Sequence, residues 1–196
     1  MIIPAVYKKF TRQLGWGVYA CRTIPAGTII MTECSYCRKL THEDASRHPQ
    51  KEFIFSHAPI TSSTYPDFMI PCREEIYFVN HSCTANILPV GDGMDVLVDT
   101  VYDNEAFSYD YRFMFDPYID FQCDCGKKNC VKRVRCFDVS ESLFAQWQDR
   151  VGKILPLIPQ LPQPLLKNKI DFEAIFFNEL VIQRTKLDSR FDHLQN

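Results

Sequence analysis

The chain of 196 residues lacks strong charge of either sign, a long apolar run and a visible leader. Its net charge of -2 creates no global field that would draw it onto nucleic acid or an anionic membrane, although a mildly acidic surface would suit a basic partner. No run of eighteen apolar residues occurs and no charged-then-apolar segment opens the sequence, so we predict neither a membrane span nor a secretory signal. A hydrophobic fraction of 46% and a charged fraction of 23% predict a soluble globular domain with a real core.

Cysteine, in contrast, is abundant. Nine cysteines are an odd count in a chain without a leader, which predicts free thiols or a metal in a reducing compartment rather than a disulfide framework. Three of them lie in the eight residues "CDCGKKNC", with Gly126 and Asn129 to turn the chain. This spacing is typical of zinc ligands, and a structural zinc takes four. For the fourth ligand, nearby Cys136, distant Cys83 and, more weakly, His81 all remain open. The three clustered cysteines are Cys123, Cys125 and Cys130.

A second pair, Cys34 and Cys37, has C-x-x-C spacing. It has no partner pair at the spacing of a zinc knuckle, so we expect incidental thiols there. For the three clustered cysteines, that explanation is the weaker one because they are so closely spaced.

Short β-rich runs separated by turn signals make up the chain before about residue 138. "WGVYAC" and "GTIIMTE" are such runs, and the Pro-Gly turn "IPAG" lies between them. "NILPV" and "MDVLVDTVY" flank "GDG", which predicts a hairpin. Residues 41–71 show little periodicity and are rich in Ser, Thr, Pro and His, so we expect a variable insert that is partly helical. The pattern predicts a mainly β domain.

Helical spacing appears only after residue 138. "SESLFAQWQDRVGKIL" opens with Ser140 as a candidate N-cap and repeats apolar residues at helical intervals. "PLIPQLPQPLL" follows, and its four prolines predict a connector without helix. Residues 171–184 predict a second helix that starts at an Asp N-cap. We expect the apolar faces of both helices to pack on the core rather than form an interface.

Three further motifs are each weak alone. "LGWGV" holds two glycines around an aromatic residue, which lets a ligand approach the backbone, although a tight turn is the commoner explanation. "YFVNHSCTAN" places Asn80, His81 and Cys83 at the end of an expected strand. "FSYDY" puts Tyr109 and Tyr111 two residues apart on a strand, where they share a face and can line one pocket.

Taken in order, the G-x-G, "FVNHSC", "SYDY" and C-x-C-x4-C motifs resemble a SET domain followed by a post-SET zinc segment, as in protein lysine methyltransferases. The resemblance covers residues 13–130. It implies a mainly β fold of small sheets in which the C-terminal part threads under a preceding loop in a knot-like arrangement. It divides the chain into a SET domain at 1–120, containing the insert at 41–71, a zinc-bound post-SET segment at 121–137, and an α-helical C-terminal extension at 138–196.

The resemblance also implies the sites. In the family, the backbone around G-x-G and the Asn-His pair hold S-adenosylmethionine. The NHSC cysteine is the fourth ligand of a structural zinc, which selects Cys83 over Cys136. The implied cofactor residues are Leu14, Gly15, Trp16, Gly17, Phe78, Asn80 and His81, and the implied zinc ligands are Cys83, Cys123, Cys125 and Cys130.

Two tyrosines match the family's catalytic positions. Tyr111 matches the catalytic tyrosine, whose hydroxyl orients the lysine amine. Tyr109 occupies a position that carries Tyr or Phe in the family, and a hydroxyl there favours mono- or dimethylation.

The expected function is methyl transfer from S-adenosylmethionine to a lysine nitrogen of a protein, with a histone tail as the first candidate. A chromatin regulator in the nucleus follows from that substrate, with the cytoplasm as the alternative. We expect no membrane and no sequence-specific nucleic acid as partner, and a possible protein partner for the C-terminal helices. The alternatives are an inactive SET-fold zinc module that recruits proteins, and a small zinc-binding structural or nucleic-acid protein.

Overall fold

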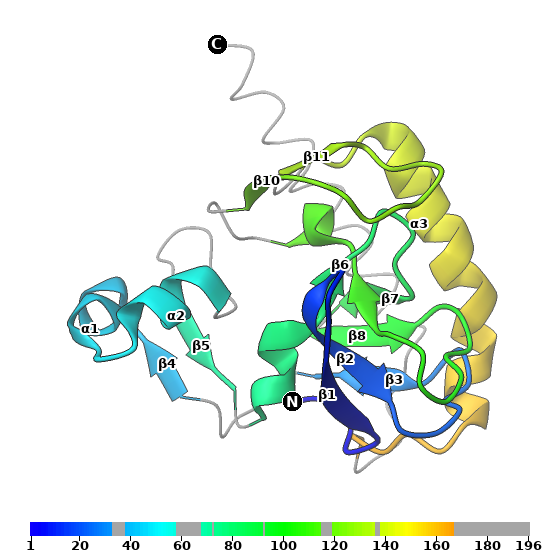
Figure 1. The fold of residues 1–196 in the computed structure, drawn as a ribbon. Coiled ribbons are helices and arrows are strands. Elements are labelled where there is room, and N and C mark those ends of the chain that lie inside the picture. Colours follow the sequence, from blue (N-terminus) through cyan, green and yellow to red (C-terminus); the bar gives the residue numbers. More distant parts are fainter. Residues whose placement is uncertain are drawn as a thin grey trace.

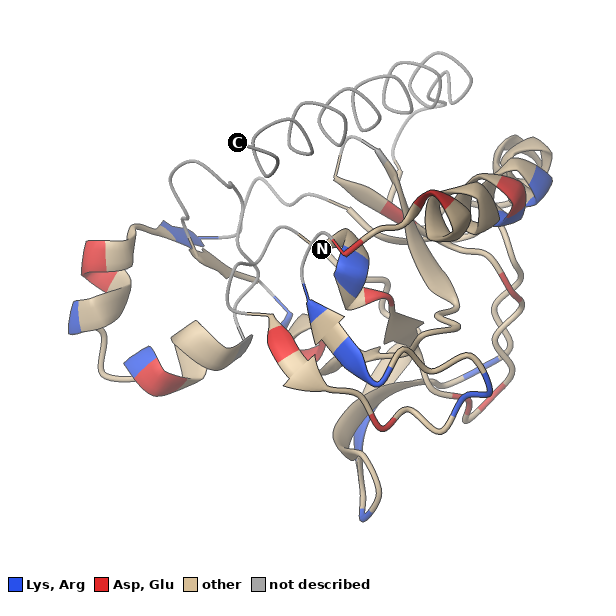
Figure 2. Ribbon diagram, turned by 90° about the horizontal axis from the view of Figure 1, so that it is seen from above, with Lys and Arg blue, Asp and Glu red and all other residues tan. Residues whose placement is uncertain are grey.

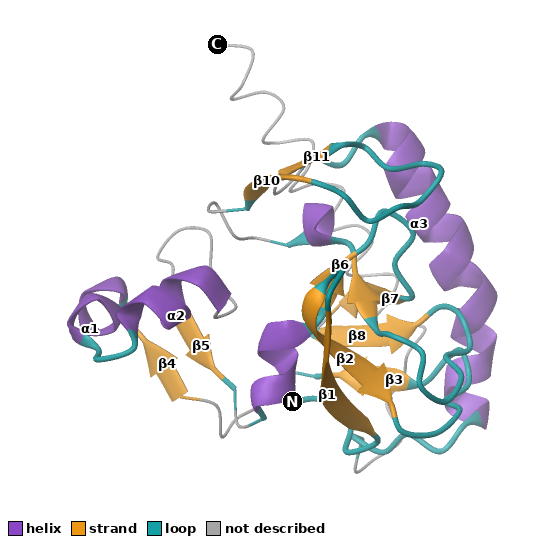
Figure 3. Ribbon diagram, in the orientation of Figure 1, coloured by secondary structure: helices purple, strands orange, loops and turns teal. Residues whose placement is uncertain are grey.

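The computed structural model describes residues 1–32, 38–57, 68–71, 73–91, 93–114, 119–135 and 138–166. These residues form several small β-sheets with few helices around them (Figures 1 and 3). The prediction of a mainly β fold is therefore confirmed, whereas the knot-like threading stays a prediction. None of the helices in this described part combines the length and apolarity needed to cross a membrane.

An antiparallel hairpin opens the chain. Strand β1 (Val6–Thr11) pairs with β2 (Gly15–Ala20) along its whole length, from Val6 opposite Ala20 to Thr11 opposite Gly15. Gly15 has a positive φ of 68°, a conformation that suits glycine, and so it closes the turn. The turn explanation of the G-x-G motif is thus correct for its first glycine.

The central sheet has five strands in the order β3-β8-β7-β9-β6. The predicted hairpin around "GDG" is confirmed, because β7 and β8 pair antiparallel. Strand β6 instead runs parallel to β9, with Asn80 opposite Ser108 and His81 opposite Tyr109. This pairing brings the "NHSC" and "SYDY" motifs side by side. The bounds are β3 (Ile29–Met31), β6 (Asn80–His81), β7 (Ile87–Gly91), β8 (Met94–Leu97) and β9 (Ser108–Tyr109).

The two faces of this sheet are both buried. Side chains alternate between the faces of a strand, so neighbours in β7 and β8 enter different cores. Ile87 and Leu97 join the core under the N-terminal residues, which includes Val18 and Phe107. The other core contains Leu88, Val90, Val96, Trp147, Val151 and Ile154.

A small unit stands apart on the opposite side from α3 (Figure 1). It contains the described part of the expected insert. Two short helices lie in it, which agrees with the prediction of a partly helical insert. Its own core consists of Leu40, Ala45, Ile54 and Phe68. Its elements are β4 (Arg38–Leu40), α1 (His42–Arg47), α2 (Lys51–His57) and β5 (Phe68–Ile70), and β4 pairs antiparallel with β5.

Three other short elements surround the central sheet. A 3₁₀ turn, η1 (Glu74–Phe78), precedes β6, and a second, η2 (Tyr111–Phe113), follows β9. Strands β10 (Asp120–Gln122) and β11 (Arg133–Arg135) form an antiparallel hairpin around the clustered cysteines.

The C-terminal extension docks on the central sheet through helix α3 (Glu141–Ile154). The helix begins where expected, because the Ser140 hydroxyl accepts a hydrogen bond from the Leu143 N–H at 3.2 Å. The Trp147 indole N–H donates to the Pro89 carbonyl at 3.0 Å. The expectation that this apolar face packs on the core is confirmed; the helix expected at 171–184 lies outside the described residues.

The proline-rich stretch was predicted to contain no helix, and that prediction is wrong for its first part. Residues Leu155–Gln160 form a 3₁₀ helix, η3, with a proline in its first turn. A 3₁₀ turn is short enough to tolerate prolines that an α-helix interior would not. Beyond it, the Gln163 side chain accepts from the Ile29 N–H at 2.8 Å and donates to the Gly27 carbonyl at 3.0 Å, which ties the extension to β3.

Replacing Trp147 with Ala should lower the free energy of unfolding by roughly 3–5 kcal/mol, because it empties a buried aromatic site and removes the bond to Pro89. Urea unfolding followed by circular dichroism measures the change. The exposed neighbour Gln148→Ala is the matched control and should change stability by less than about 0.5 kcal/mol. A loss below about 1 kcal/mol at Trp147 would contradict the docking of α3.

Candidate functional site and metal centre

The first part of the site is the contact between the G-x-G motif and Asn80. The Asn80 side-chain N–H donates to the Trp16 carbonyl at 2.9 Å. A Cβ at Gly17 would lie 3.2 Å from the Asn80 amide nitrogen and 3.1 Å from the Tyr19 ring. A larger residue at position 17 would therefore press on both side chains, and the structure brings the two predicted cofactor motifs together.

Exposed aromatic rings border this contact. Trp16 is 50% exposed and Phe10 59% exposed, and their rings meet edge to face at 5.7 Å. The Phe78 ring lies 6.3 Å from that of Trp16, and the Lys8 ammonium sits 4.8 Å from the Phe78 centroid. Of the predicted cofactor residues, Trp16, Gly17, Phe78 and Asn80 thus gather in one place, and Leu14 and Gly15 belong to the adjoining turn.

His81 connects this place to the tyrosines and to the cysteines. Its Nδ1 accepts a hydrogen bond from the Tyr111 N–H at 3.1 Å, and its Nε2 lies 3.3 Å from the Cys83 sulfur. Burial lowers the pKa of His81 and outweighs the attraction of Asp110, so the ring is neutral at physiological pH. Since Nδ1 accepts, Nε2 carries the proton and points it at Cys83. The ring therefore serves the metal site, and any contact to a cofactor would fall to the His81 backbone.

Tyr111 lies in a group of three rings. The rings of Tyr111, His81 and Phe121 pack edge to face, at centroid separations of 5.5 to 6.1 Å. The Tyr111 hydroxyl donates to the Val79 carbonyl at 2.6 Å. Phe121 comes from β10, so the hairpin that holds the cysteines also supplies a wall beside Tyr111. Phe121 was not singled out from sequence; its position two residues before Cys123 is the signal that could have indicated it.

The prediction that Tyr109 and Tyr111 share one strand is wrong. Strand β9 ends at Tyr109, and Asp110 caps the 3₁₀ turn that begins with Tyr111 by accepting from the Arg112 N–H at 3.1 Å. Asp110 and Arg112 also form a buried ion pair, at 2.5 and 2.9 Å. Asp110 capping breaks the strand, and the buried pair, also missed from sequence, fixes the turn.

Tyr109 lies on the same side of the sheet as a partly exposed carboxyl, that of Asp95. Tyr109 pairs with Ile87, Ile87 pairs with Leu97, and Asp95 lies two residues before Leu97 on the same face of β8. Burial raises the pKa of Asp95 to about 7, and the nearby Tyr109 hydroxyl lowers it in part. Burial and the Asp95 charge raise the pKa of Tyr109 well above its usual value. Asp95 was not singled out from sequence.

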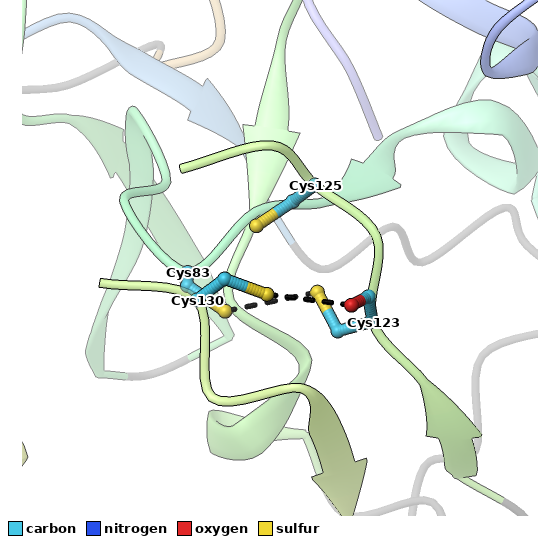
Figure 4. A group of neighbouring side chains, drawn as sticks. All are labelled: Cys83, Cys123, Cys125 and Cys130. Atoms are coloured by element: carbon cyan, nitrogen blue, oxygen red, sulfur yellow. Dashed lines mark hydrogen bonds between the residues drawn. The ribbon is translucent and has the colours of Figure 1, made fainter. Parts of the chain in front are cut away.

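The candidate metal centre consists of four cysteines whose sulfurs lie within 4.8 Å of one another (Figure 4). Cys83 comes from the loop after β6, and Cys123, Cys125 and Cys130 from the loop between β10 and β11. The Cys83 and Cys123 sulfurs are 3.7 Å apart. Tetrahedral zinc with Zn–S bonds of ~2.3 Å requires ~3.8 Å between sulfurs, so the four residues fit the ion.

The thiols of this cluster differ in pKa. Burial raises the pKa of Cys83 and of Cys123. Burial also acts to raise the pKa of Cys125, but hydrogen bonds from backbone groups and the neighbouring thiols outweigh it and lower this pKa to about 7. Gly126, at a positive φ of 69°, turns the chain between ligands as expected. The alternative ligand Cys136 and the pair Cys34 and Cys37 lie outside the described residues.

Comparison with known families is consistent with this geometry. Residues 15–100 match the family model of the SET domain. Residues 15–100 therefore form a SET domain, and SET domains are in general those of protein lysine methyltransferases that use S-adenosylmethionine. The match includes the G-x-G motif, Asn80, His81 and Cys83, and it ends before Tyr109, Tyr111 and the other three cysteines.

Replacing Cys83 with Ser should lower bound zinc from about one ion per chain to well below half, since hydroxyl is a poor zinc ligand at neutral pH. Elemental analysis of the purified protein after dialysis measures the metal. Cys21 is exposed and lies outside the cluster, so Cys21→Ser is the matched control. Unchanged zinc in Cys83→Ser would assign the fourth ligand elsewhere.

The raised pKa of Asp95 predicts that the stability of the protein depends on pH. The pKa of this carboxyl in the folded protein, about 7, lies above the unfolded value of ~3.9, so between these values only the folded state holds the proton. The free energy of unfolding should therefore fall as pH rises from about 4 through 7, by about 4 kcal/mol as an upper limit. Relative to Asp95→Asn, the wild type should lose stability over this range in urea titrations. The exposed Asp103→Asn should parallel the wild type; a flat difference between wild type and Asp95→Asn would refute the raised pKa.

Proposed function

We propose that this protein transfers methyl groups from S-adenosylmethionine to a lysine side-chain nitrogen of a protein, with histone tails as the substrate class. The observation that carries the proposal is the parallel pairing of β6, which lies within the SET match, with β9, which follows it. The pairing brings Asn80, which contacts the G-x-G backbone, and His81, whose ring contacts the Tyr111 N–H, beside the tyrosine motif. The groups that would bind the methyl donor and the groups that would act in the reaction therefore lie in one site.

On the cofactor side, the surroundings of Trp16 suit a charged molecule with a flat aromatic base. Trp16 and Phe78 offer ring faces, the Asn80 amide offers both a donor and an acceptor, and Gly17 allows backbone contact. When bound, S-adenosylmethionine supplies the methyl group on a sulfonium that makes it transferable.

On the substrate side, the difficulty is the lysine proton. A lysine with a pKa of ~10.4 is neutral only about 0.04% of the time at pH 7, a deficit of roughly 4.6 kcal/mol. An apolar channel disfavours the ammonium and lowers that pKa. A hydroxyl that donates to Val79, as in Tyr111, can accept an N–H of the neutral amine and so turn the nitrogen lone pair toward the methyl group.

The zinc would act structurally in this proposal. Cys83 is joined to the cofactor strand, and the other three ligands belong to the hairpin that carries Phe121. Closing the tetrahedron fixes that hairpin against Tyr111 and His81. No step of the transfer requires the metal to touch the substrate.

The proposal of a histone tail as substrate is supported by charge alone. The chain is slightly acidic, and Figure 2 shows Asp and Glu interspersed with Lys and Arg along the described elements. A basic tail meets no opposing field on such a surface. The nucleus follows as the proposed location, with the cytoplasm as the alternative, and chromatin regulation as the proposed role.

A labelled methyl-transfer assay tests the proposal. The purified protein receives radiolabelled S-adenosylmethionine with core histones, nucleosomes or whole-cell lysate in parallel. Tyr111→Phe should lower transfer by a factor on the order of 10² without weakening cofactor binding, because it removes only the hydroxyl. The exposed Tyr102→Phe is the matched control and should transfer normally.

Each outcome of the assay is informative. Label on one protein band that disappears in Tyr111→Phe supports a lysine methyltransferase and names its substrate. Transfer that is equal in Tyr111→Phe removes the assigned role of Tyr111. No label, together with cofactor binding no tighter than millimolar, supports the alternative of a SET-fold module that recruits proteins.

Replacing Tyr109 with Phe should shift products toward higher methylation, because loss of the hydroxyl leaves more room around a methylated amine. Mass spectrometry of the product over time, at equal total turnover, measures the ratio of mono-, di- and trimethyl-lysine. Tyr102→Phe again serves as control. An identical product ladder for Tyr109→Phe and wild type would show that Tyr109 does not limit methylation.

A further inference from the structure

We propose that Lys8 binds the carboxylate of S-adenosylmethionine and so fixes the amino-acid end of that cofactor beside Trp16 and Phe78. This inference rests on the proposed function, since it takes S-adenosylmethionine as the molecule that the site binds. It gives a binding role to a side chain of β1, a strand that precedes the G-x-G motif and belongs to none of the sequence motifs.

The hairpin of β1 and β2 places Lys8 on the same face as Trp16. Lys8 lies opposite Val18, and Phe10 lies opposite Trp16. Residues directly opposite one another, and residues two apart in one strand, share a face. Val18 is fully buried, whereas Trp16 is half exposed. Lys8 therefore lies where this face passes from the N-terminal core to the exposed aromatic rings.

The Lys8 ammonium contacts both aromatic rings that we assign to the cofactor. Its nitrogen lies 4.8 Å from the centroid of the Phe78 ring and 5.7 Å from that of the Trp16 ring. The Lys8 side chain is 27% exposed. A lysine stem can cover apolar surface in this way while its charged end stays at the edge. A positive charge is thus held at the rim of the surface on which the cofactor would rest.

Glu74 orients this ammonium. The Lys8 nitrogen donates to a Glu74 carboxylate oxygen at 2.6 Å. Glu74 is the first residue of η1 and Phe78 the last, so Lys8 contacts both ends of that turn. The Glu74 side chain is 66% exposed, and an ion pair of this kind contributes little to stability. An ammonium has three N–H donors, and the bond to Glu74 uses one, so a carboxylate of the cofactor can accept another.

The charges of the cofactor determine which of its groups Lys8 prefers. At neutral pH S-adenosylmethionine carries one negative group, its carboxylate, and two positive groups, the sulfonium and the amino group. Lys8 attracts the first and repels the other two. The ribose hydroxyls and the adenine nitrogens are neutral acceptors, which bind an ammonium less strongly than a carboxylate does. The carboxylate is therefore the strongest partner that the cofactor offers to Lys8.

The surroundings of Lys8 make such a partner necessary. A carboxylate that moves from water to a place beside apolar rings loses hydration, which costs free energy unless a cation compensates. Glu74 adds to this cost, because its negative charge lies 2.6 Å from the Lys8 nitrogen and would repel the carboxylate of the cofactor. The Lys8 ammonium compensates for both effects.

Calorimetric titration without a protein substrate tests the contact. The zinc-loaded full chain, as wild type and as Lys8→Met, is titrated with S-adenosylmethionine and with decarboxylated S-adenosylmethionine, which has a hydrogen in place of the carboxylate. Methionine keeps an unbranched stem against the rings but carries no charge. Lys8→Met should bind S-adenosylmethionine about tenfold more weakly than the wild type, the effect of one charge-assisted hydrogen bond. The decarboxylated compound should bind both proteins equally.

Lys9→Met is the matched control. Lys9 is the exposed neighbour of Lys8 in β1 and points to the opposite face, where its ammonium lies 5.2 Å from the Tyr19 ring centroid. The substitution removes the same charge from the same strand, and it should leave the affinity for S-adenosylmethionine unchanged. Equal weakening in Lys8→Met and Lys9→Met would be an effect of net charge and would overturn the proposal.

A second pair of variants separates loss of the Lys8 contact from repulsion by Glu74. Glu74→Gln removes the negative charge that Lys8→Met would leave without its partner. In a Glu74→Gln background, Lys8→Met should still weaken binding of S-adenosylmethionine and still leave binding of the decarboxylated compound unchanged. If the loss disappears in this background, repulsion by Glu74 explains it and the assignment of Lys8 to the carboxylate is wrong.

The remaining outcomes separate this inference from the proposed function. Equal weakening of both compounds by Lys8→Met means that Lys8 only shapes the site, and it overturns the inference alone, as does unchanged affinity for S-adenosylmethionine. Binding by the wild type no tighter than millimolar overturns the inference together with the proposed function. A loss confined to S-adenosylmethionine, in a wild type that transfers no methyl group, supports the role of Lys8 and overturns the proposed transfer.

Discussion

The parallel pairing of β6 with β9 is the contact on which the rest of the site depends. Each strand contributes only two residues, so the ladder alone would be weak. Asn86 reinforces it: its side chain accepts from the Ser108 N–H at 2.8 Å and donates to the Ala106 carbonyl at 2.9 Å. The Ser82 N–H donates to the Tyr109 carbonyl at 3.1 Å. These bonds hold the cofactor motif and the tyrosine motif in one register.

His81 links these two motifs to the candidate metal centre. One neutral ring accepts from the Tyr111 backbone and directs its proton at Cys83, so tyrosine and zinc ligand are joined through two bonds. A hydrogen bond to a ligand of a metal also fixes the orientation of the donor. If the four cysteines hold zinc as proposed, its removal should therefore disturb Tyr111 through His81 and Phe121. The structural and reactive parts of the site form one continuous network.

Motif order predicted from sequence which segments meet, and spacing predicted three of the four cysteines that lie within 4.8 Å. The fourth, Cys83, was indicated only by the resemblance to the SET family. The other contacts of the candidate site depend on strand register, which short motifs do not encode. Asp95 and Tyr109 come onto one side of the sheet because β7 aligns Ile87 with both Leu97 and Tyr109. Tyr-x-Tyr suggested a continuous strand, but Asp110 ends it by capping the next turn. Local capping prevailed over the alternation of side chains.

The two tyrosines differ in what fixes their positions. Val79 offers Tyr111 a backbone carbonyl, an acceptor that no pH change alters, so the orientation of the Tyr111 hydroxyl is constant. Tyr109 is instead positioned by strand β9, from which its ring packs against the N-terminal core. Asp110 ends the strand between them, so alternation of side chains does not determine how the Tyr111 ring lies. The buried Asp110–Arg112 ion pair and the Val79 carbonyl fix it, which makes the orientation of Tyr111 depend on this turn rather than on the sheet.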